Sequence, residues 1–563
     1  MTNLSNDWLV PAASLVPLVA AFALLALRRL TDVAAAQVGT LVGLATLGIA
    51  VAATLITSDT GADRLEVDAQ WVPALGMRFH LGMDGISAPL VLLTAVLGLL
   101  VCAHLVRIRP TAGRGRQLVA CVLAVTGGAI ATFTALDLLL FFVAFETVLI
   151  PMWFVIAVWG DDQQPELVLS SGSTQPGGEN ARRDAANRFI LYTATGSAVM
   201  LLGIILIALR TGTTDLVELA RQDGSGMSTA VQITAAALIV LGLAVKAPMW
   251  PLHTWLPPAH TIAPTAGSVL LAGVLLKMGT YGLVRVAVPV LPDGMAELAP
   301  YLGIFGVVGI LWGGLACLVE RDLKRLVALS SVAHMGFVLL GVASMTPTGL
   351  QGALFANIAH GIVTALLFFV VGALKDRHHT SDLGLLGSGL RDRLPRLGWL
   401  LTLGAIAGLG LPGLAVFWGE LLAITGAWES DTLDGLARPL AVLAAIGTAV
   451  AAAYWLRVLR VLWQGPPDER WAASSAGSAE GAAGYPGAGL SASTPVSSGS
   501  GASGSKLLGV VTKPVTIGDA TAHESMITAP LVLATVALGL APGPLLALTA
   551  PAVRLLLGVE VSP

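Results

Sequence analysis

Residues 242–285 read GLAVKAPMWPLHTWLPPAHTIAPTAGSVLLAGVLLKMGTYGLVR and place two lysines, Lys246 and Lys277, inside apolar runs. Five prolines and two histidines lie between these lysines. A charged lysine at membrane depth costs about 2.5–3.5 kcal/mol on insertion scales, and broken backbone there survives only inside protein or beside a wet cavity. The stretch therefore predicts the proton- or ion-handling centre of a polytopic membrane protein.

The composition of the whole chain agrees with a membrane protein. Of its 563 residues, 55% are hydrophobic and only 12% are charged, whereas soluble domains carry about 25% charged residues. Apolar runs of about 20 residues recur, which is long enough to cross about 30 Å of hydrocarbon. We therefore expect an all-α polytopic fold. No basic cluster with interleaved aromatic residues indicates nucleic-acid binding.

The hydrophobic runs predict about 14 transmembrane helices. We expect them at residues 8–27, 33–56, 84–106, 117–135, 138–159, 187–209, 229–252, 264–288, 298–319, 323–345, 348–374, 398–424, 436–463 and 526–556. An even number of spans places both termini on the same side of the membrane.

The loops between these spans alternate in charge. Loops near Arg28, Arg116 and Arg393 are basic, and those near Asp68 and Asp434 are neutral or acidic. Because basic loops remain in the cytoplasm, we expect a multi-pass protein of the bacterial cell membrane with both termini outside. No basic residue precedes the first apolar run, so we expect no cleavable signal peptide.

Two spans carry proline interruptions, at Lys246-Ala-Pro248 and at Gly410-Leu-Pro412-Gly413. Interruptions at corresponding positions of two halves are typical of inverted repeats with a site at the breaks. The predicted units are N-terminal helices 1–3 in residues 1–116, a first repeat in 117–288, an inverted second repeat in 298–463, a flexible cytoplasmic Gly/Ser-rich linker in 465–525 and a last helix in 526–563.

Glu146 lies near the middle of the fifth span, where a carboxylate must be protonated or paired. Pairing with Lys246 would offset the cost of both charges, either as a working switch or as a static ion pair. Lys246 lies near the end of its span and could also extend to the interface. Lys277 is flanked by apolar residues on both sides, which favours a functional role.

Further ionisable residues follow at depth. His334 and His360 lie in consecutive spans, and Glu420 follows the second break. Because histidine titrates near neutral pH, the two histidines are candidates for a proton relay, although such residues are often hydrogen-bonded parts of a core. Glu420 is then the expected terminal proton site. His253 and His260, beside the prolines, either supply the path or cap helix ends.

The cysteines carry no motif for redox or metal chemistry. Cys102, Cys121 and Cys317 are isolated in apolar stretches, without CxxC or iron–sulfur spacing. We expect them to serve core packing. No ligand spacing among the histidines, including His378 and His379, predicts a metal site.

Several stretches resemble a known family. The motif HTWLPPAHTIAPTAGSVLLAGVLLKMGTYGLVR resembles the signature of subunit M of proton-pumping NADH–quinone oxidoreductase (respiratory complex I), whose mitochondrial counterpart is NADH dehydrogenase chain 4. LKRLVALSSVAHMGFVLLG, NIAHGIVTALLFFVVGALKDR and GLPGLAVFWGE match further stretches of that family in the same order. The resemblance covers roughly residues 84–460.

The resemblance implies an antiporter-like subunit with 14 helices in two inverted five-helix repeats, with helices 7 and 12 broken. It assigns proton translocation to six residues of this sequence: Glu146, Lys246, Lys277, His334, His360 and Glu420. It implies no cofactor in this chain, with flavin and iron–sulfur clusters in partner subunits. The implied partners are the other membrane subunits, especially the neighbouring L and N subunits, together with membrane lipid and protons.

The sequence departs from the family pattern in three places. Pro258 replaces the aspartate usual in WLPDAH, Leu329 stands where many relatives have tyrosine, and the 465–525 linker is unusually long. These departures leave the central residues intact and affect the cytoplasmic half of the path.

Three rival interpretations remain open at this point. One is a subunit of a multisubunit cation/proton antiporter, which would move sodium without any NADH-dependent reductase. Another is a subunit of a related membrane hydrogenase pump. The third is a purely structural membrane subunit, in which Lys246 and Lys277 would tolerate leucine or methionine.

Overall fold

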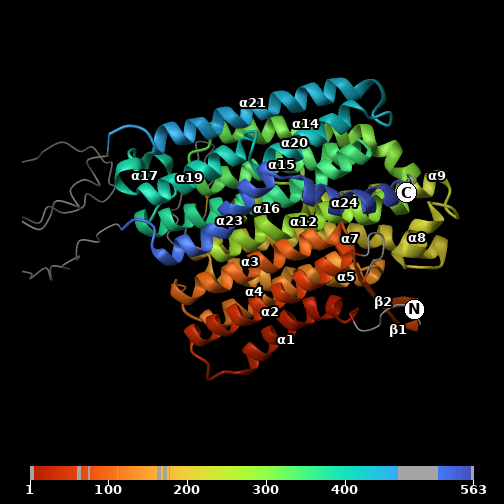
Figure 1. Ribbon diagram of the computed structural model, residues 1–563, viewed down its shortest axis with the longest axis horizontal. Helices are drawn as coiled ribbons and strands as arrows, with labels where there is room; N and C mark the ends of the chain where they lie inside the picture. Colours follow the sequence, from red (N-terminus) through yellow and green to blue (C-terminus); the bar gives the residue numbers. More distant parts are fainter. Residues whose placement is uncertain are drawn as a thin grey trace, which may run out of the picture.

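The structure is a computed structural model that describes residues 6–59, 65–73, 76–108, 110, 112–161, 167–168, 174–175, 178–466 and 518–558. Its helices lie side by side along one axis and form a single elongated bundle (Figure 1). The first half contains α1 Leu9–Ala26, α2 Asp32–Asp59, β1 Leu65–Val72, β2 Met77–Met83, α3 Ser87–Arg107, α4 Gly115–Thr134, α5 Leu138–Thr147, α6 Leu149–Trp159, β3 Leu167–Val168, β4 Thr174–Gln175, α7 Gly178–Thr211, α8 Leu216–Gln222 and α9 Thr229–Lys246.

The second half begins within residues 242–285, which are interrupted by prolines and are named here the broken stretch. It contains α10 Leu256–Ile262, α11 Thr265–Leu270, α12 Leu276–Gly282, α13 Val288–Val290, α14 Pro292–Val319, α15 Leu323–Ala343, α16 Pro347–His378, α17 Leu383–Leu386, α18 Leu390–Arg393, α19 Pro395–Gly408, α20 Ala415–Trp428, α21 Ala437–Leu462, α23 Ala522–Leu540 and α24 Gly543–Leu556. Two π-helical turns, Leu271–Leu275 and Leu283–Ala287, join α11, α12 and α13 into one continuous helical run.

The predicted polytopic helical fold is confirmed. Within the described residues, 13 helices are long and apolar enough to cross a membrane. The remaining expected span, 398–424, corresponds to the pair α19 and α20, each 14 residues long. The bundle therefore accommodates the expected 14 spans.

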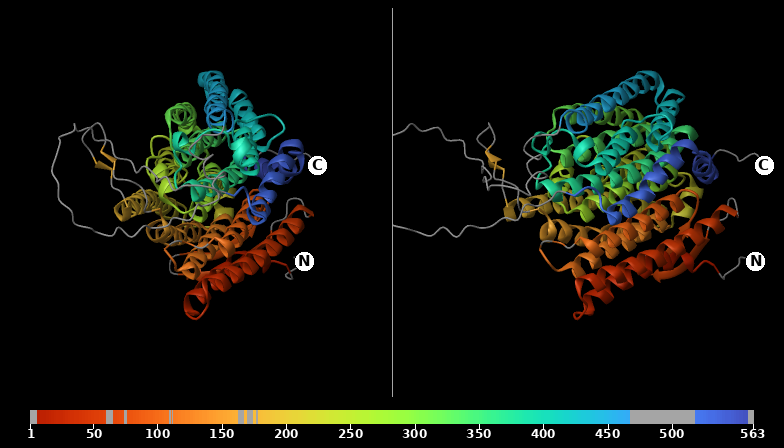
Figure 2. Two further views of the ribbon diagram at one scale, coloured as in Figure 1. Left: turned by 90° about the vertical axis from the view of Figure 1, so that its left-hand side faces the viewer. Right: turned by 60° about the vertical axis from the view of Figure 1, so that its left-hand side comes forward.

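The helices of the broken stretch lie at the centre of the bundle. In the most apolar part of residues 265–290, of α15 and of α16, every residue is buried. In the most apolar part of α2, only 28% of the residues are buried. Figure 2 shows the N-terminal helices on one side of the bundle and α21 on the opposite side. The lysine- and histidine-bearing helices are thus enclosed by the rest of the chain.

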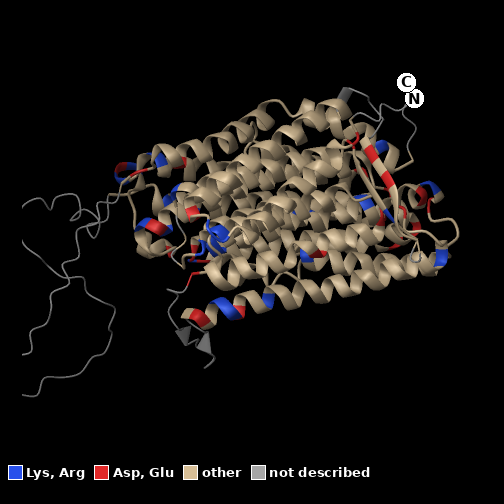
Figure 3. Ribbon diagram, turned by 90° about the horizontal axis from the view of Figure 1, so that it is seen from below, with Lys and Arg blue, Asp and Glu red and all other residues tan. Residues whose placement is uncertain are grey.

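Charged residues gather at the two ends of the bundle (Figure 3). We name the end with loops 27–31 and 379–394 the basic end. The opposite end, with the β1–β2 hairpin and α8, is named the acidic end. Both termini lie at the acidic end (Figure 1), as an even number of crossings requires.

The β1–β2 hairpin was not expected from the sequence. Its strands pair antiparallel with Leu65 opposite Met83 and Gln70 opposite Arg78. Gly76, at φ +64°, takes the left-handed conformation in the connecting turn, which glycine adopts without steric cost. The hairpin packs its buried β2 residues on the end of the bundle, so it adds a small sheet to an otherwise helical fold.

Helical geometry is lost at both proline interruptions seen in the sequence. Helix α9 ends at Lys246 and α10 begins at Leu256, and Pro248 and Pro251 between them lack the backbone N–H that a helix needs. The second interruption separates Gly408 from Ala415 and contains Gly410 at φ +75° and Gly413 at φ +92°.

The last predicted span, 526–556, is wrong as a single helix. It is divided into α23 and α24 at Ala541–Pro542. A residue before proline is driven out of helical geometry, and Ala541 accordingly has φ −133° and ψ 73°. Helix α23 also begins at Ala522, inside the predicted 465–525 linker. Most of that linker, residues 467–517, lies outside the described residues.

Candidate functional site

Lys277 forms the centre of the buried polar site. Its side chain is completely buried on α12, between the two π-helical turns. The Lys277 Nζ donates to the Ala272 carbonyl at 2.6 Å and lies 2.5 Å from His360 Nδ1 on α16. A backbone carbonyl and an imidazole nitrogen thus replace the water that an ammonium group loses on burial.

The line continues from His360 to the second break. The rings of His360 and His334, on α15, lie 5.5 Å apart in an edge-to-face arrangement. His334 Nδ1 lies 3.2 Å from Glu420 Oε1 on α20. Four predicted site residues from four helical segments therefore lie in one buried row, Lys277–His360–His334–Glu420, named here the polar line. Within the described residues, His360 Nε2 has no hydrogen-bond partner.

The broken backbone shapes the end of the polar line. Glu420 is only 4% exposed. A side chain at Gly410 would place its Cβ atom 2.6 Å from Glu420 Oε2. Glycine suits this point, because its φ of +75° is left-handed and a Cβ atom would displace the carboxylate.

The predicted contact between Glu146 and Lys246 is not formed directly. Within the described residues Lys246 Nζ has no hydrogen-bond acceptor, although its side chain is 2% exposed, and it lies 4.5 Å from the centre of the Phe145 ring. Glu146 instead accepts a hydrogen bond of 2.5 Å from the Ser197 hydroxyl. The two charges interact electrostatically through the protein without forming a contact ion pair.

Close backbone packing brings the two lysine-bearing helices together. A Cβ atom at Gly279, two residues after Lys277, would lie 2.7 Å from the Leu243 carbonyl oxygen and 2.8 Å from the Ala247 nitrogen. Trp255 holds the broken stretch against α9 by donating from Nε1 to the Val245 carbonyl at 2.9 Å. The end of α9 that carries Lys246 is thereby packed against α12.

His253 and His260 are both buried within the broken stretch. The His253 ring lies 4.3 Å from Trp312, and the His260 ring stacks on Phe368 at 4.6 Å. Neither ring nitrogen of His260 has a hydrogen-bond partner among the described residues. This geometry does not support helix capping by the His260 side chain.

Three polar residues near the site were not predicted from the sequence. Ser197 binds Glu146, and Asn357 accepts a hydrogen bond of 2.8 Å from the Thr280 hydroxyl. Lys324 lies at the start of the predicted span 323–345, yet it is only 3% exposed. Asn357 could have been identified, because it precedes His360 by three residues and so lies on the same helix face.

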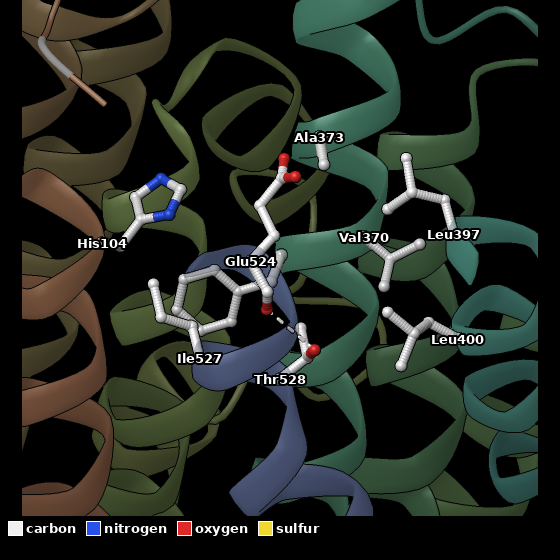
Figure 4. Close-up of a pocket in the computed structure, with 9 residues that line it drawn as sticks. His104, Val370, Ala373, Leu397, Leu400, Glu524, Ile527 and Thr528 are labelled. Atoms are coloured by element: carbon white, nitrogen blue, oxygen red, sulfur yellow. Dashed lines mark hydrogen bonds between the residues drawn. The ribbon is translucent and has the colours of Figure 1, made fainter. Parts of the chain in front are cut away.

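A small pocket lies away from the polar line, between α3, α16, α19 and α23 (Figure 4). Its polar residues are His104, Glu524 and Thr528, and the remaining lining is apolar. Glu524 makes two hydrogen bonds of 2.8 Å with Arg377, which attaches α23 to α16. We interpret this pocket as part of the packing contact between α16 and α23. Among the described residues, no three His, Cys, Asp or Glu side chains form a group that could hold a metal ion.

Comparison with known proteins places these features in a family. Residues 173–445 match the sequence profile described as NADH:quinone oxidoreductase/Mrp antiporter, transmembrane. That range contains the two lysines, the two histidines and Glu420, whereas Glu146 precedes it.

Individual relatives extend the match. NAD(P)H-quinone oxidoreductase chain 4 1 of Synechococcus sp. (strain JA-3-3Ab) is 40% identical over 399 residues, which are 71% of this chain and 72% of that protein. NADH-quinone oxidoreductase subunit M of Rickettsia prowazekii is 35% identical over 70% of this chain and 75% of its own length.

Solved structures agree with the sequence comparison. A chain of respiratory complex I from Thermus thermophilus is 27% identical, with a TM-score of 0.75 over 98% of this chain and 100% of that chain. A chain of the Mrp complex from Dietzia sp. DQ12-45-1b is 24% identical, with a TM-score of 0.79 over 98% of both chains, and shows a shared fold. The chain therefore belongs to the family of NADH-quinone oxidoreductase subunit M, which is named chain 4 in the NAD(P)H-quinone oxidoreductases.

Proposed function

We propose that this chain is the proton-translocating, non-redox membrane subunit of an NADH–quinone oxidoreductase. The observation that carries the proposal is the polar line, in which lysine, two histidines and glutamate succeed one another inside a buried helix bundle. Membership of the subunit M family supports the same function. Electron transfer, with its flavin and iron–sulfur clusters, would take place in other subunits.

The chemistry of the line suits proton transfer. A protonated Lys277 can give its proton to a neutral His360, because the two nitrogens are 2.5 Å apart. Imidazole accepts a proton on one nitrogen and releases one from the other, so transfer through His334 to the Glu420 carboxylate follows. Release from protonated Glu420 to the outside restores the line for the next proton.

Glu146 and Lys246 would control the start of this sequence. Glu146 is partly exposed on the outside of the bundle, while Lys246 is buried. The Glu146 charge acts on Lys246 through the protein, and an electrostatic change of about 1.4 kcal/mol alters a protonation equilibrium tenfold. A change of charge in a neighbouring subunit near Glu146 would thus alter the protonation of Lys246 and, through its charge, proton transfer to Lys277.

The orientation in the membrane, the neighbouring subunits and the internal symmetry follow from the same proposal. The basic end would face the cytoplasm and both termini the outside, as expected for positively charged loops. The neighbouring antiporter-like L and N subunits would contact the lipid-facing helices. The two predicted repeats, residues 117–288 and 298–463, would be related by inversion, with one broken helix in each.

Purification of the tagged chain from its native membranes tests the proposal. We expect it to isolate a complex that reduces quinone with NADH and, in vesicles, acidifies the lumen during turnover. An isolated complex without NADH oxidation that exchanges sodium for protons would contradict the proposal. That result would support the antiporter function, which the structural likeness to the Mrp complex keeps as the alternative.

A further inference from the structure

Lys324 has an unexpected environment for a residue at the end of a helix. It is the second residue of α15, where lysine side chains usually extend towards the interface. Here the side chain is 3% exposed, and its Nζ donates to the Ala263 carbonyl at 2.5 Å. Ala263 directly follows α10, so Lys324 lies against the end of the broken stretch.

An ion pair reaches the same helix end from the surface. Lys375 on α16 pairs with Asp161, and their side chains are 15% and 19% exposed. The backbone N–H of Asp161 donates to the Ile262 carbonyl at 2.7 Å. The ion pair and Lys324 therefore converge on two consecutive residues, Ile262 and Ala263, at the basic end.

Exposure falls step by step from this surface towards the interior. Asp376 is exposed, the Lys375–Asp161 pair is partly exposed, and Lys324 is buried. Lys324 interacts electrostatically with the carboxylates of Asp376 and Asp161. An exposed carboxylate is therefore connected with a buried amine through charged groups.

His260 continues the series inwards. It is completely buried on α10, and it interacts electrostatically with Lys324 and with Lys277. Both of its ring nitrogens lack a hydrogen-bond partner among the described residues, so both are available to accept or donate a proton. His260 thus lies within electrostatic reach of the charged groups at the basic end and of the polar line.

We propose that Asp376, the Lys375–Asp161 pair and Lys324 form the proton intake at the basic end and supply His260. Asp376 captures a proton from solvent, a neutral Lys324 receives it, and the resulting ammonium passes one proton to His260. His260 releases a proton towards Lys277, which returns each group to its starting state. The inference rests on the proposed function.

The intake draws its carboxylates from outside α10. Helix α10, LPPAHTI, has a proline at position 258 and carries no acidic residue of its own, but carboxylates from other segments act at its end. They come from Asp161, which precedes α7 in the sequence, and from Asp376 near the end of α16. The basic half of the path therefore does not require an acidic residue on α10.

Substitutions of Lys324 in the intact complex test the intake. We expect Lys324→Met to lower NADH-driven proton uptake by inverted vesicles at least about tenfold, because a positioned proton-transfer group contributes about 10²–10⁴-fold. Lys324→Arg should be equally impaired, because guanidinium keeps its proton. Arg325→Met, at the adjacent exposed position, is the matched control and should resemble wild type. Complex content is matched by NADH–ferricyanide reductase activity.

The outcomes separate the intake from the proposed function. Normal uptake in Lys324→Met, or its recovery in Lys324→Arg, would overturn the intake and make Lys324 a structural cation. If Lys324→Met prevents assembly, Asp376→Asn replaces it, since this carboxylate is exposed. We expect that variant to lose proton uptake at alkaline pH, and an unchanged pH profile would contradict the intake. A Lys246→Met variant that loses uptake while Lys324→Met keeps it would leave the proposed function standing.

Discussion

At the residue scale, His80 of β2 is held between carboxylates at the acidic end. Its Nδ1 lies 2.5 Å from Asp215 Oδ2, and its Nε2 lies 3.7 Å from Glu66. Burial alone lowers the pKa of His80, but the hydrogen bond with Asp215 and the nearby negative charges outweigh it and raise the pKa. Burial alone raises the pKa of Asp215, but the hydrogen bond from His80 and backbone hydrogen bonds outweigh it and lower the pKa.

These shifts predict pH-dependent attachment of the hairpin. The contribution of His80 is complete below its ordinary pKa of about 6.5 and is lost as the pH rises through its raised pKa. That of Asp215 is complete above about 3.9 and is lost as the pH falls through its lowered pKa. We expect His80→Gln to lower hairpin stability by about 1–2 kcal/mol at pH 6 and by less at pH 9. Amide hydrogen exchange of residues 77–83, measured at both pH values, checks this prediction. Equal protection of wild type and variant at both pH values would contradict the ion pair.

The buried pair Asp84–Arg285 predicts a larger effect. Arg285 lies 2.5 Å from Asp84 Oδ2 and donates from Nε to the Tyr281 hydroxyl at 3.1 Å. Removing one partner of a buried pair typically costs about 3–5 kcal/mol, because the other charge stays buried. We expect Asp84→Asn to lower the melting temperature of the purified complex, and the double variant Asp84→Asn/Arg285→Met to recover much of the loss. A double variant less stable than Asp84→Asn would contradict this explanation.

The sequence could predict the residues of the polar line but not all of their contacts. Lys277, His334, His360 and Glu420 were identifiable, because ionisable groups at membrane depth are costly and therefore stand out. The predicted direct contact between Glu146 and Lys246 was wrong, since the Ser197 hydroxyl on α7, in the next span along the chain, donates to the Glu146 carboxylate instead. Lys324 was overlooked, because its position at a span end does not show whether the side chain turns inwards.

At the element scale, the break between α19 and α20 brings the backbone close to Glu420. The substitution Gly410→Ala adds a Cβ atom 2.6 Å from Glu420 Oε2 at φ +75°, and such backbone strain costs about 1–3 kcal/mol. We expect a displaced carboxylate and slower NADH-driven proton uptake at matched complex content. Gly435→Ala is the control, because no atom lies within 4 Å of its added Cβ. Wild-type uptake in Gly410→Ala would show that the close approach does not position Glu420.

Most helices could be predicted from the length of the apolar runs. The elements that could not be predicted in this way have local causes. Spans of about 20 apolar residues locate helices well, because the bilayer sets their length. The β1–β2 hairpin was missed because it is short and lies outside the spans. The division of the last helix at Pro542 follows from backbone sterics, which a hydrophobic run does not reveal.

At the scale of the whole molecule, the bundle encloses the buried ionisable residues of the polar line and gathers its other charged residues at its two ends (Figure 3). The polar line leads to Glu420 beside the second break, and the carboxylates near Lys324 lie at the basic end. The broken stretch and the three enclosed helices form its centre. In the proposed function this arrangement supplies a buried proton path from the basic end, which a merely structural subunit would not need.

The measurement that tests the central claim most directly is NADH-driven proton uptake into inverted membrane vesicles. Wild type is compared with Lys246→Met at matched complex content, and Arg325→Met is the control. We predict that Lys246→Met loses at least about nine tenths of the uptake, because the buried charge that controls proton transfer to Lys277 is removed. Proton uptake and NADH–quinone turnover that both equal wild type would contradict the account and make Lys246 a structural cation.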